Sequence, residues 1–576
     1  MLVLGQPETT EIWMMNRYIH HRPRIFSLFL ITIATFATHW MALFNEGLIA
    51  EDSGMFPALL YKDWHALMDM YSSAAVPVFS YFVWPLAFVV NIFLYKAVVI
   101  LAVYFIAILA YLIALRSGYF SEKEALLVGI FSQQLPIATI TTIFTYSTYF
   151  NALALFLLAT YLFVWMETKR GFQHAFVRGL SLCIYFVAFT FNSLLVLYAG
   201  AFLLVYMVRL RIEGQQVRNR SDAVNTFKLF CRSRIDFTLL PIIYWAWKKI
   251  FTPKSGLYGS YNAFDLSPKH LVKNSYHFVA DGFVLPLAKS IGSIHSYAML
   301  VVAICSVLIV WMFWKFAGSP NQPANNEPVN EQGSWALVGF GFFLLVCGTL
   351  PYILVGKSPM SGVLMRNTIL MQVPLSVMLV GAWRVLQSRA ITVAKTNVAT
   401  VALLILFVLF TARWWENYAA WQARAAKDIA VAQYLAKNPP WANFSVYWIE
   451  DNFPLQGSDA DYGFADYTAQ FRMLWGGQTR MAFTPGHRDF FDVDSAPGVR
   501  PVHTNLPERI SFFCNDWSST RDIDLAGPQA VLDIKPGEGA STNEEIAFKY
   551  MYFRFIKPQG LQDYLNGLVT VKLRPL

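Results

Sequence analysis

Three carboxylates stand close together near the N-terminus, directly after a long apolar stretch. They are Glu46, Glu51 and Asp52. A carboxylate can take a proton from a hydroxyl group or bind a cation, so this group could supply a general base or metal ligands. Asp52 followed by Ser53 is also a common way to cap the start of a helix. The residues alone leave both interpretations open.

Two basic residues flank a short turn much later in the chain. Lys357 and Arg366 lie in the segment Gly-Lys-Ser-Pro-Met-Ser-Gly-Val-Leu-Met-Arg, which separates two apolar stretches. A guanidinium group can hold a phosphate through two parallel hydrogen bonds, so Arg366 is the first candidate for a phosphate contact and Lys357 the second. The alternative is that both residues anchor the chain by extending their charged ends to lipid headgroups.

Three further polar residues are candidates for contacts with a donor or an acceptor molecule. They are His65, Lys269 and His270. A single histidine in a loop is more often a surface or structural residue, and a loop lysine more often meets lipid headgroups. None of the five cysteines belongs to a Cys/His pattern with zinc spacing. The residues therefore specify no cofactor, and a divalent cation stays open as an alternative.

The composition indicates what must position these residues. Hydrophobic residues make up 56% of the 576 residues and charged residues only 14%, whereas a soluble protein carries roughly 25% charged residues. The formal net charge is +9, and the basic residues gather in short loops between apolar stretches. This is the positive-inside pattern of membrane proteins rather than the basic face of a nucleic-acid-binding domain. We therefore expect a multi-pass membrane protein that contacts membrane lipids and no nucleic acid.

Apolar segments bounded by charged residues predict about eleven transmembrane helices. The N-terminal tail, residues 1–24, is basic and is expected inside, which places residues 45–92 outside as the first outer loop. An odd number of crossings also places the C-terminus outside. The expected crossings are 25–44, 93–115, two within 126–165, two within 176–208, 237–251, 297–316, 335–355, 369–383 and 398–410.

The segments outside the predicted membrane helices differ in pattern. In the first outer loop, residues 56–71 have helical apolar spacing and residues 77–90 are apolar, so both are expected at the membrane surface. Residues 414–576 predict a small extracytoplasmic α/β domain behind the membrane domain of residues 25–413. Its expected elements are a helix over 419–437 and strands over 444–449, 510–513, 530–534, 550–556 and 568–573.

The order of features around the first acidic group resembles the first outer loop of GT-C glycosyltransferases. A membrane helix is followed by Glu51-Asp52, an amphipathic helix, the stretch Val-Pro-Val-Phe-Ser-Tyr-Phe-Val-Trp-Pro at 76–85, and a second membrane helix. Protein O-mannosyltransferases and lipid A aminoarabinose transferases are families of this kind that use polyprenyl-phosphate sugars. Those families commonly carry Asp-Glu where this chain has Glu-Asp, so the resemblance leaves open which carboxylate corresponds.

The resemblance implies a GT-C-like fold of about eleven transmembrane helices and a sugar transferase. A sugar would pass from a polyprenyl-phosphate donor to a hydroxyl of a glycan, lipid or protein acceptor outside the membrane. Asp52 would be the base, with Glu51 second and Glu46 third, and Arg366 and Lys357 would bind the donor phosphate. A transporter or flippase of a lipid-linked saccharide is the alternative, but the predicted helices carry no charged residue at mid-depth. The single outer sequon, Asn443-Phe-Ser, favours a bacterial inner membrane.

Overall fold

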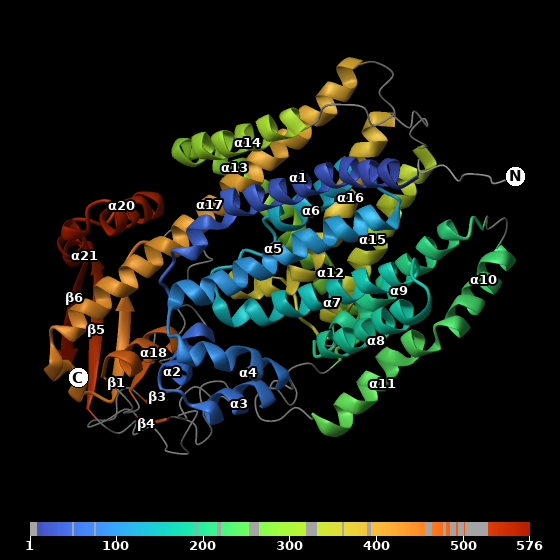
Figure 1. Ribbon diagram of the computed structural model, residues 1–576. Coiled ribbons are helices and arrows are strands. Elements are labelled where there is room, and N and C mark those ends of the chain that lie inside the picture. Colours follow the sequence, from blue (N-terminus) through green and yellow to red (C-terminus); the bar gives the residue numbers. More distant parts are fainter. Residues whose placement is uncertain are drawn as a thin grey trace, which may run out of the picture.

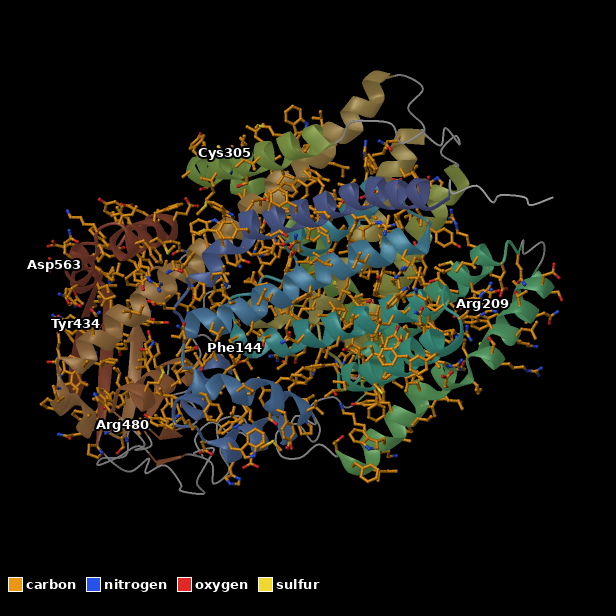
Figure 2. All side chains as sticks on the ribbon, viewed as in Figure 1. Phe144, Arg209, Cys305, Tyr434, Arg480 and Asp563 are labelled. Atoms are coloured by element: carbon orange, nitrogen blue, oxygen red, sulfur yellow. The ribbon has the colours of Figure 1, made fainter. Side chains whose placement is uncertain are left out.

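The computed structural model is mostly helical, with a small sheet at one end of a long helical bundle (Figure 1). We call the end with the sheet and the C-terminus the domain end. The opposite end holds the start of α1 and α10, and Figure 2 shows Arg209 there, so we call it the basic end. The structure describes residues 9–48, 51–73, 76–191, 193–215, 220–252, 264–317, 331–359, 362–388, 393–455, 464–475, 480–483, 491–492, 500–501 and 528–576.

The helices fall into a bundle group and a group at the domain end. The first comprises α1 (Thr9–Leu43), α5 (Ile92–Ser117), α6 (Glu122–Gln134), α7 (Ser147–Met166), α8 (Gly171–Ala188), α9 (Ser193–Ile212), α10 (Arg220–Ser233), α11 (Ile235–Phe251), α12 (Pro268–Val279), α13 (Leu285–Gly292), α14 (Tyr297–Ala317), α15 (Glu331–Leu354), α16 (Gln372–Ser388) and α17 (Val393–Ala436). The second comprises α2 (Glu51–Leu60), α3 (Trp64–Ser73), α4 (Val78–Val83), α18 (Phe464–Trp475), α20 (Asn543–Phe555) and α21 (Leu561–Leu568). Short tight helices include η1 (Trp84–Phe88), η2 (Phe144–Tyr146) and η6 (Gly362–Met371).

Seven helices in the described residues are long and apolar enough to cross a membrane, or eight if a bent pair counts as one crossing. The chain is thus a polytopic α-helical membrane protein, but the predicted number of about eleven crossings is wrong. Three of the predicted crossings fall on α6, α8 and α11, which do not qualify; α6 has 13 residues and α11 has 17, below the roughly 20 that a bilayer requires. The predicted crossing at α14 counts only together with α12 and α13, which meet it at a bend of 106°.

The first outer loop forms several short helices rather than one. The predicted helix over 56–71 is divided between α2 and α3, because the chain turns at Lys62, whose φ is +55°. Asp63 then begins α3, since its carboxylate accepts a hydrogen bond of 2.9 Å from the Ala66 amide. The apolar stretch 77–90 forms α4 and η1, where Tyr81, Phe82 and Phe88 are exposed. Exposed aromatic rings in a membrane protein favour placement at the bilayer surface.

The C-terminal residues form a sheet of four strands in the order β2-β1-β5-β6. β1 (Val446–Asp451) pairs in parallel with β2 (Met481–Phe483) and β5 (Gln529–Pro536), and β6 (Val569–Pro575) pairs antiparallel with β5. A separate pair joins β3 (Phe491–Asp492) and β4 (Arg500–Pro501). The predicted strand at 550–556 is wrong, because these residues belong to α20, capped by Thr542. The predicted strand at 510–513 lies outside the described residues.

One long helix joins the membrane bundle to the sheet. Helix α17 has 44 residues, so the predicted crossing at 398–410 and the predicted helix at 419–437 are parts of one continuous rod. The predicted domain boundary at 413–414 falls inside it. The second half of α17 buries alanines against the sheet, including Ala423, Ala426 and Ala430. Alanine favours the helical state and lets other elements approach closely, so the rod positions the sheet against the bundle.

The connection between α6 and α7 is irregular and buried. Residues 135–143 form no helix, and nearly all side chains from 131 to 150 are buried. Backbone groups at this depth need protein partners because lipid offers none. Side chains from later helices supply them: Thr368 donates to the Ile137 carbonyl at 2.6 Å, and Asn417 donates to the Thr139 carbonyl at 3.0 Å. This segment leads directly into η2, which forms the centre of the candidate site.

Candidate functional site

Asp52 lies in the first turn of α2, and only 1% of its side chain is exposed. One oxygen accepts hydrogen bonds from the Thr145 amide at 2.6 Å and from the Thr145 hydroxyl at 2.8 Å. The other accepts from the Phe144 amide at 2.9 Å and from Lys96 at 3.3 Å. A carboxylate has about four acceptor positions. All four are therefore occupied by donors from other segments, which makes Asp52 a fixed connection between α2 and η2.

Lys96 lies in the second turn of α5 and is also 1% exposed. Its ammonium group donates to the Gly47 carbonyl at 2.9 Å and to the Thr142 carbonyl, in addition to its ion pair with Asp52. An ammonium group has three hydrogens, and the three acceptors satisfy them. The ion pair thus joins α5, the loop after α1, the irregular segment and α2 at one point.

Arg366 on η6 contacts the same turn. Its guanidinium donates a hydrogen bond of 2.8 Å to the Tyr146 hydroxyl and lies 5.3 Å from the centre of the Tyr146 ring. Tyr146 directly follows Thr145, which holds Asp52. The predicted base and the predicted phosphate ligand, 314 positions apart in the chain, therefore end on adjacent residues of η2. Figure 2 shows the neighbouring Phe144 inside the bundle, on the side that faces the domain end.

A row of aromatic rings extends from Arg366 to α4. Tyr146 and Tyr149 have ring centres 5.9 Å apart, and Tyr149 lies 4.5 Å from Phe191. Phe191 in turn lies 5.4 Å from Phe79 on α4. Tyr149 and Phe191 are only half-buried. Aromatic faces of this kind can pack on the apolar faces of a sugar or on an isoprenoid chain.

The other two carboxylates occupy different positions. Glu46 follows α1 and forms an ion pair of 2.6 Å with Arg554 on α20, and it also accepts a hydrogen bond from the Tyr550 hydroxyl. Burial and the nearby Glu46 charge raise the pKa of Tyr550 above its ordinary value. Glu46 therefore connects the first loop to the C-terminal domain. Glu51 is the first residue of α2, and its side chain lies outside the described part of the chain.

The remaining predicted site residues divide into one group near η6 and two separate positions. Lys357 is half-buried directly after α15. His270 on α12 pairs with Asp265, whose amide donates to the Leu354 carbonyl at 2.8 Å, so His270 lies near the same loop. The hydrogen bond from His270 lowers the pKa of Asp265. Lys269 and His65 are exposed, and no hydrogen bond or ion pair links either to the described residues of the site.

Sequence reasoning missed the two residues that hold Asp52. Lys96 carried a signal, because a lysine near the start of an apolar helix must find an acceptor as the helix enters the membrane. Thr145 carried none, since a threonine in an aromatic turn has many ordinary roles. Among the described residues, no group of three or more His, Cys, Asp or Glu side chains is arranged to hold a metal ion.

No protein-family model matches the chain, and a search of curated proteins also finds no match.

Proposed function

We propose that this protein is a membrane glycosyltransferase that moves a sugar from a polyprenyl-phosphate donor to a hydroxyl of a glycan, lipid or protein acceptor. The observation that carries the proposal is the meeting of Asp52 and Arg366 on η2. A transfer of this kind needs a carboxylate and a cation at the same depth, because the donor lipid stays in the bilayer. The two side chains come from the loops in which the sequence suggested those two roles.

Arg366 is the proposed contact for the donor phosphate, with Lys357 in the same loop as a second cation. Its guanidinium donates one hydrogen bond to Tyr146, and a planar guanidinium group matches the geometry of phosphate oxygens. As the bond between sugar and phosphate breaks, negative charge grows on the leaving phosphate. A fixed cation stabilises that charge in a site with little water. The row of rings beside Tyr146 would hold the sugar or the first isoprene units.

A carboxylate of the first outer loop is the proposed base. It would remove the acceptor hydroxyl proton while that oxygen attacks the sugar carbon. Asp52 is the first candidate, and in this role it must exchange one of its four donors for the acceptor hydroxyl. Glu51 is the neighbouring candidate, and it could act while Asp52 keeps η2 in place. Glu46, the third candidate, forms an ion pair with Arg554 on α20, which favours a role for Glu46 in docking the C-terminal domain.

The C-terminal domain adjoins the first outer loop, because α18 packs against α2. We propose that this contact places an acceptor-recognition surface beside the site. With the basic end inside, as the positive-inside rule requires, the domain and the site both face the outer compartment. A bacterial inner membrane with a periplasmic C-terminal domain is the setting that we propose.

The test is a transfer assay in proteoliposomes with a panel of polyprenyl-phosphate sugars. The variants are Arg366→Ala, Asp52→Asn and Glu51→Gln, with Arg574→Ala on the distant strand β6 as a matched arginine control. Removing a charge-assisted hydrogen bond costs roughly 1.5–3 kcal/mol, so Arg366→Ala should lower transfer about tenfold to a hundredfold. Arg574→Ala should leave it unchanged. Absence of transfer by the wild type over the whole panel, or full transfer by all three variants, would refute the proposal.

A transporter or flippase of a lipid-linked saccharide is the second candidate, and one observation favours it. The irregular segment 135–143 interrupts the helical path between α6 and α7, and broken helices often form substrate sites in transporters. The same vesicles distinguish the two candidates. A fluorescent polyprenyl-phosphate sugar that crosses the bilayer without losing its sugar indicates a flippase.

A further inference from the structure

The chain that follows α1 contacts both the C-terminal domain and the Asp52 site within a few residues. Phe44, Asn45, Glu46 and Gly47 come directly after α1, and we call them the linking turn. Helix α20 of the C-terminal domain lies along α17 at the domain end (Figure 1) and reaches this turn. The linking turn is therefore a direct path between the domain and the buried carboxylate.

One side of the linking turn is held by α20. Arg554 donates a hydrogen bond of 2.8 Å to the Phe44 carbonyl and forms an ion pair of 2.6 Å with Glu46. The Tyr550 hydroxyl also donates to Glu46. The ring centres of Phe44 and Phe555 are 5.1 Å apart. A guanidinium that binds a carboxylate and the carbonyl of the preceding residue fixes the local backbone strongly, so the position of the turn follows the position of α20.

The other side of the linking turn holds the cation of the Asp52 site. The Gly47 carbonyl accepts a hydrogen bond of 2.9 Å from Lys96. The contact of this ammonium group with Asp52, at 3.3 Å, is longer than its contacts with the Gly47 and Thr142 carbonyls. A buried ammonium group needs an acceptor for each of its three hydrogens. A shift of the Gly47 carbonyl must therefore change the contacts of Lys96, and the long contact with Asp52 is the easiest to lose.

The linking turn is packed too closely for its residues to move separately. A Cβ at Gly47 would lie 3.0 Å from the Asn45 side-chain oxygen and 3.1 Å from the Ala425 Cβ on α17. The Gly47 amide donates to the same Asn45 oxygen at 2.9 Å, and the Asn45 nitrogen donates to Gln422 at 3.3 Å. Close packing of this kind transmits a displacement instead of absorbing it. A movement that begins at Glu46 thus reaches the Gly47 carbonyl.

We propose that the linking turn is a conformational coupling through which the docked C-terminal domain keeps Asp52 fully hydrogen-bonded. In the docked state all four acceptor positions of the carboxylate are occupied, so it has no position for a further hydroxyl. Displacement of α20 moves Glu46 and Gly47, loosens the contact between Lys96 and Asp52, and opens one acceptor position. The coupling consists of contacts within the chain, so its test needs no transferase activity.

The experiment is hydrogen exchange of the full chain in detergent micelles, measured by mass spectrometry. The reporters are the amides of Phe144 and Thr145, because both donate to Asp52. Arg554→Ala removes the main contacts of α20 with the turn. Exchange at the two reporter amides should become about fivefold faster, which corresponds to about 1 kcal/mol for the loss of a partly exposed ion pair. Gly47→Ala disturbs the turn without changing α20, and it should also make these amides exchange faster.

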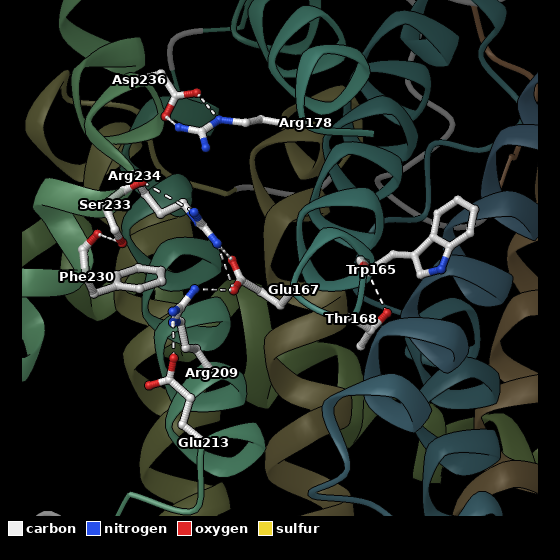
Figure 3. Close-up of polar contacts among 10 residues, drawn as sticks. All are labelled: Trp165, Glu167, Thr168, Arg178, Arg209, Glu213, Phe230, Ser233, Arg234 and Asp236. Carbon is white, nitrogen blue, oxygen red and sulfur yellow. Dashed lines mark hydrogen bonds and ion pairs between the residues drawn. The ribbon is translucent and has the colours of Figure 1, made fainter. Parts of the chain in front are cut away.

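Two control variants remove comparable ion pairs that lie elsewhere. Figure 3 shows Arg178 bound to Asp236, a pair of 2.6 Å that joins α8 to α11. The side chains of this pair are 28% and 31% exposed, close to the 22% and 36% of Arg554 and Glu46, so Arg178→Ala is a matched control. Lys549→Ala is the control within α20, because Lys549 pairs with Glu545 of the same helix at 2.6 Å.

Exchange at residues 144 and 145 should rise in Arg554→Ala and Gly47→Ala, while residues 150–160 in the middle of α7 keep the wild-type rate. This comparison separates a local coupling from a general loss of stability, which would raise exchange at both places. Both control variants should match the wild type at the reporter amides. Unchanged exchange at residues 144 and 145 in Arg554→Ala and Gly47→Ala, or an equal rise in Arg178→Ala, would overturn the proposal.

Discussion

Replacement of Asp52 by asparagine is expected to destabilise the protein strongly. The carboxylate is buried and accepts four hydrogen bonds, one of them from the buried ammonium of Lys96. Asparagine retains one oxygen acceptor and turns an NH₂ group toward N–H and O–H donors. Lys96 then keeps two carbonyl partners but has no carboxylate. Breaking a buried ion pair by removing one partner costs about 3–5 kcal/mol, and we expect Asp52→Asn to fall in this range.

The assay is unfolding in mixed detergent micelles, followed by tryptophan fluorescence, with the free energy of unfolding compared among variants. Asp69→Asn is the matched control, because Asp69 lies on the exposed side of α3 and such a surface change should alter stability by less than about 0.5 kcal/mol. The double variant Asp52→Asn with Lys96→Met should cost less than the sum of the two single variants. The difference should be about 0.5–3 kcal/mol, because the double variant leaves no unpaired ammonium.

Two results would contradict this reasoning. One is an Asp52→Asn protein no less stable than Asp69→Asn, which would mean that the buried ion pair does not form. The other is strict additivity of the two single variants, which would mean that Asp52 and Lys96 do not interact.

The same stability data separate the two roles of Asp52. A loss of transfer in molecules that remain folded indicates a base, whereas a loss in proportion to unfolding indicates a positioning residue.

Three other predictions concern helix packing, domain docking and acidity. Gly341→Ala should destabilise by about 1–3 kcal/mol in the same unfolding assay, because a Cβ there would lie 2.9 Å from the Met378 backbone nitrogen, whereas Gly339→Ala has open space and should not. Arg554→Ala removes an ion pair of 2.6 Å and a hydrogen bond of 2.8 Å to the loop after α1, so hydrogen exchange should increase in α20 while the sheet stays protected. The pKa of Asp265 is lower in the folded state than its ordinary value of 3.8. The ionised Asp265 carboxylate therefore stabilises the folded state fully above pH 3.8, and this stabilisation is lost as the pH falls through the lower folded pKa. The protection factors of the amides at residues 264–270 should thus be unchanged from neutral to mildly acidic pH and fall only on strong acidification, and a fall already at mildly acidic pH would contradict the contact.

The individual apolar helices could be predicted from the sequence because hydropathy is a local property. The crossing predicted at 93–115 is α5, and the strands predicted at 444–449 and 530–534 are β1 and β5. Two of the crossings that failed, at α6 and α8, lie where two apolar runs share one long stretch. Hydropathy shows that residues 126–165 are apolar, but it does not show that α6 ends after 13 residues. The helix can end there because η6 and α17 supply hydrogen-bond partners to the irregular segment.

In the candidate site, too, the sequence predicts the chemistry of single residues, and only the tertiary structure shows their partners. Residue type alone marked Asp52 and Arg366 as able to act on a proton and a phosphate, and their meeting on η2 required folding. The tertiary structure decided that Asp52 is paired with Lys96, that Glu46 contacts the C-terminal domain, and that α17 continues unbroken into the sheet. The physical reason is that a single side chain determines its own chemistry and local backbone preference, whereas its partner depends on how helices far apart in the chain pack together.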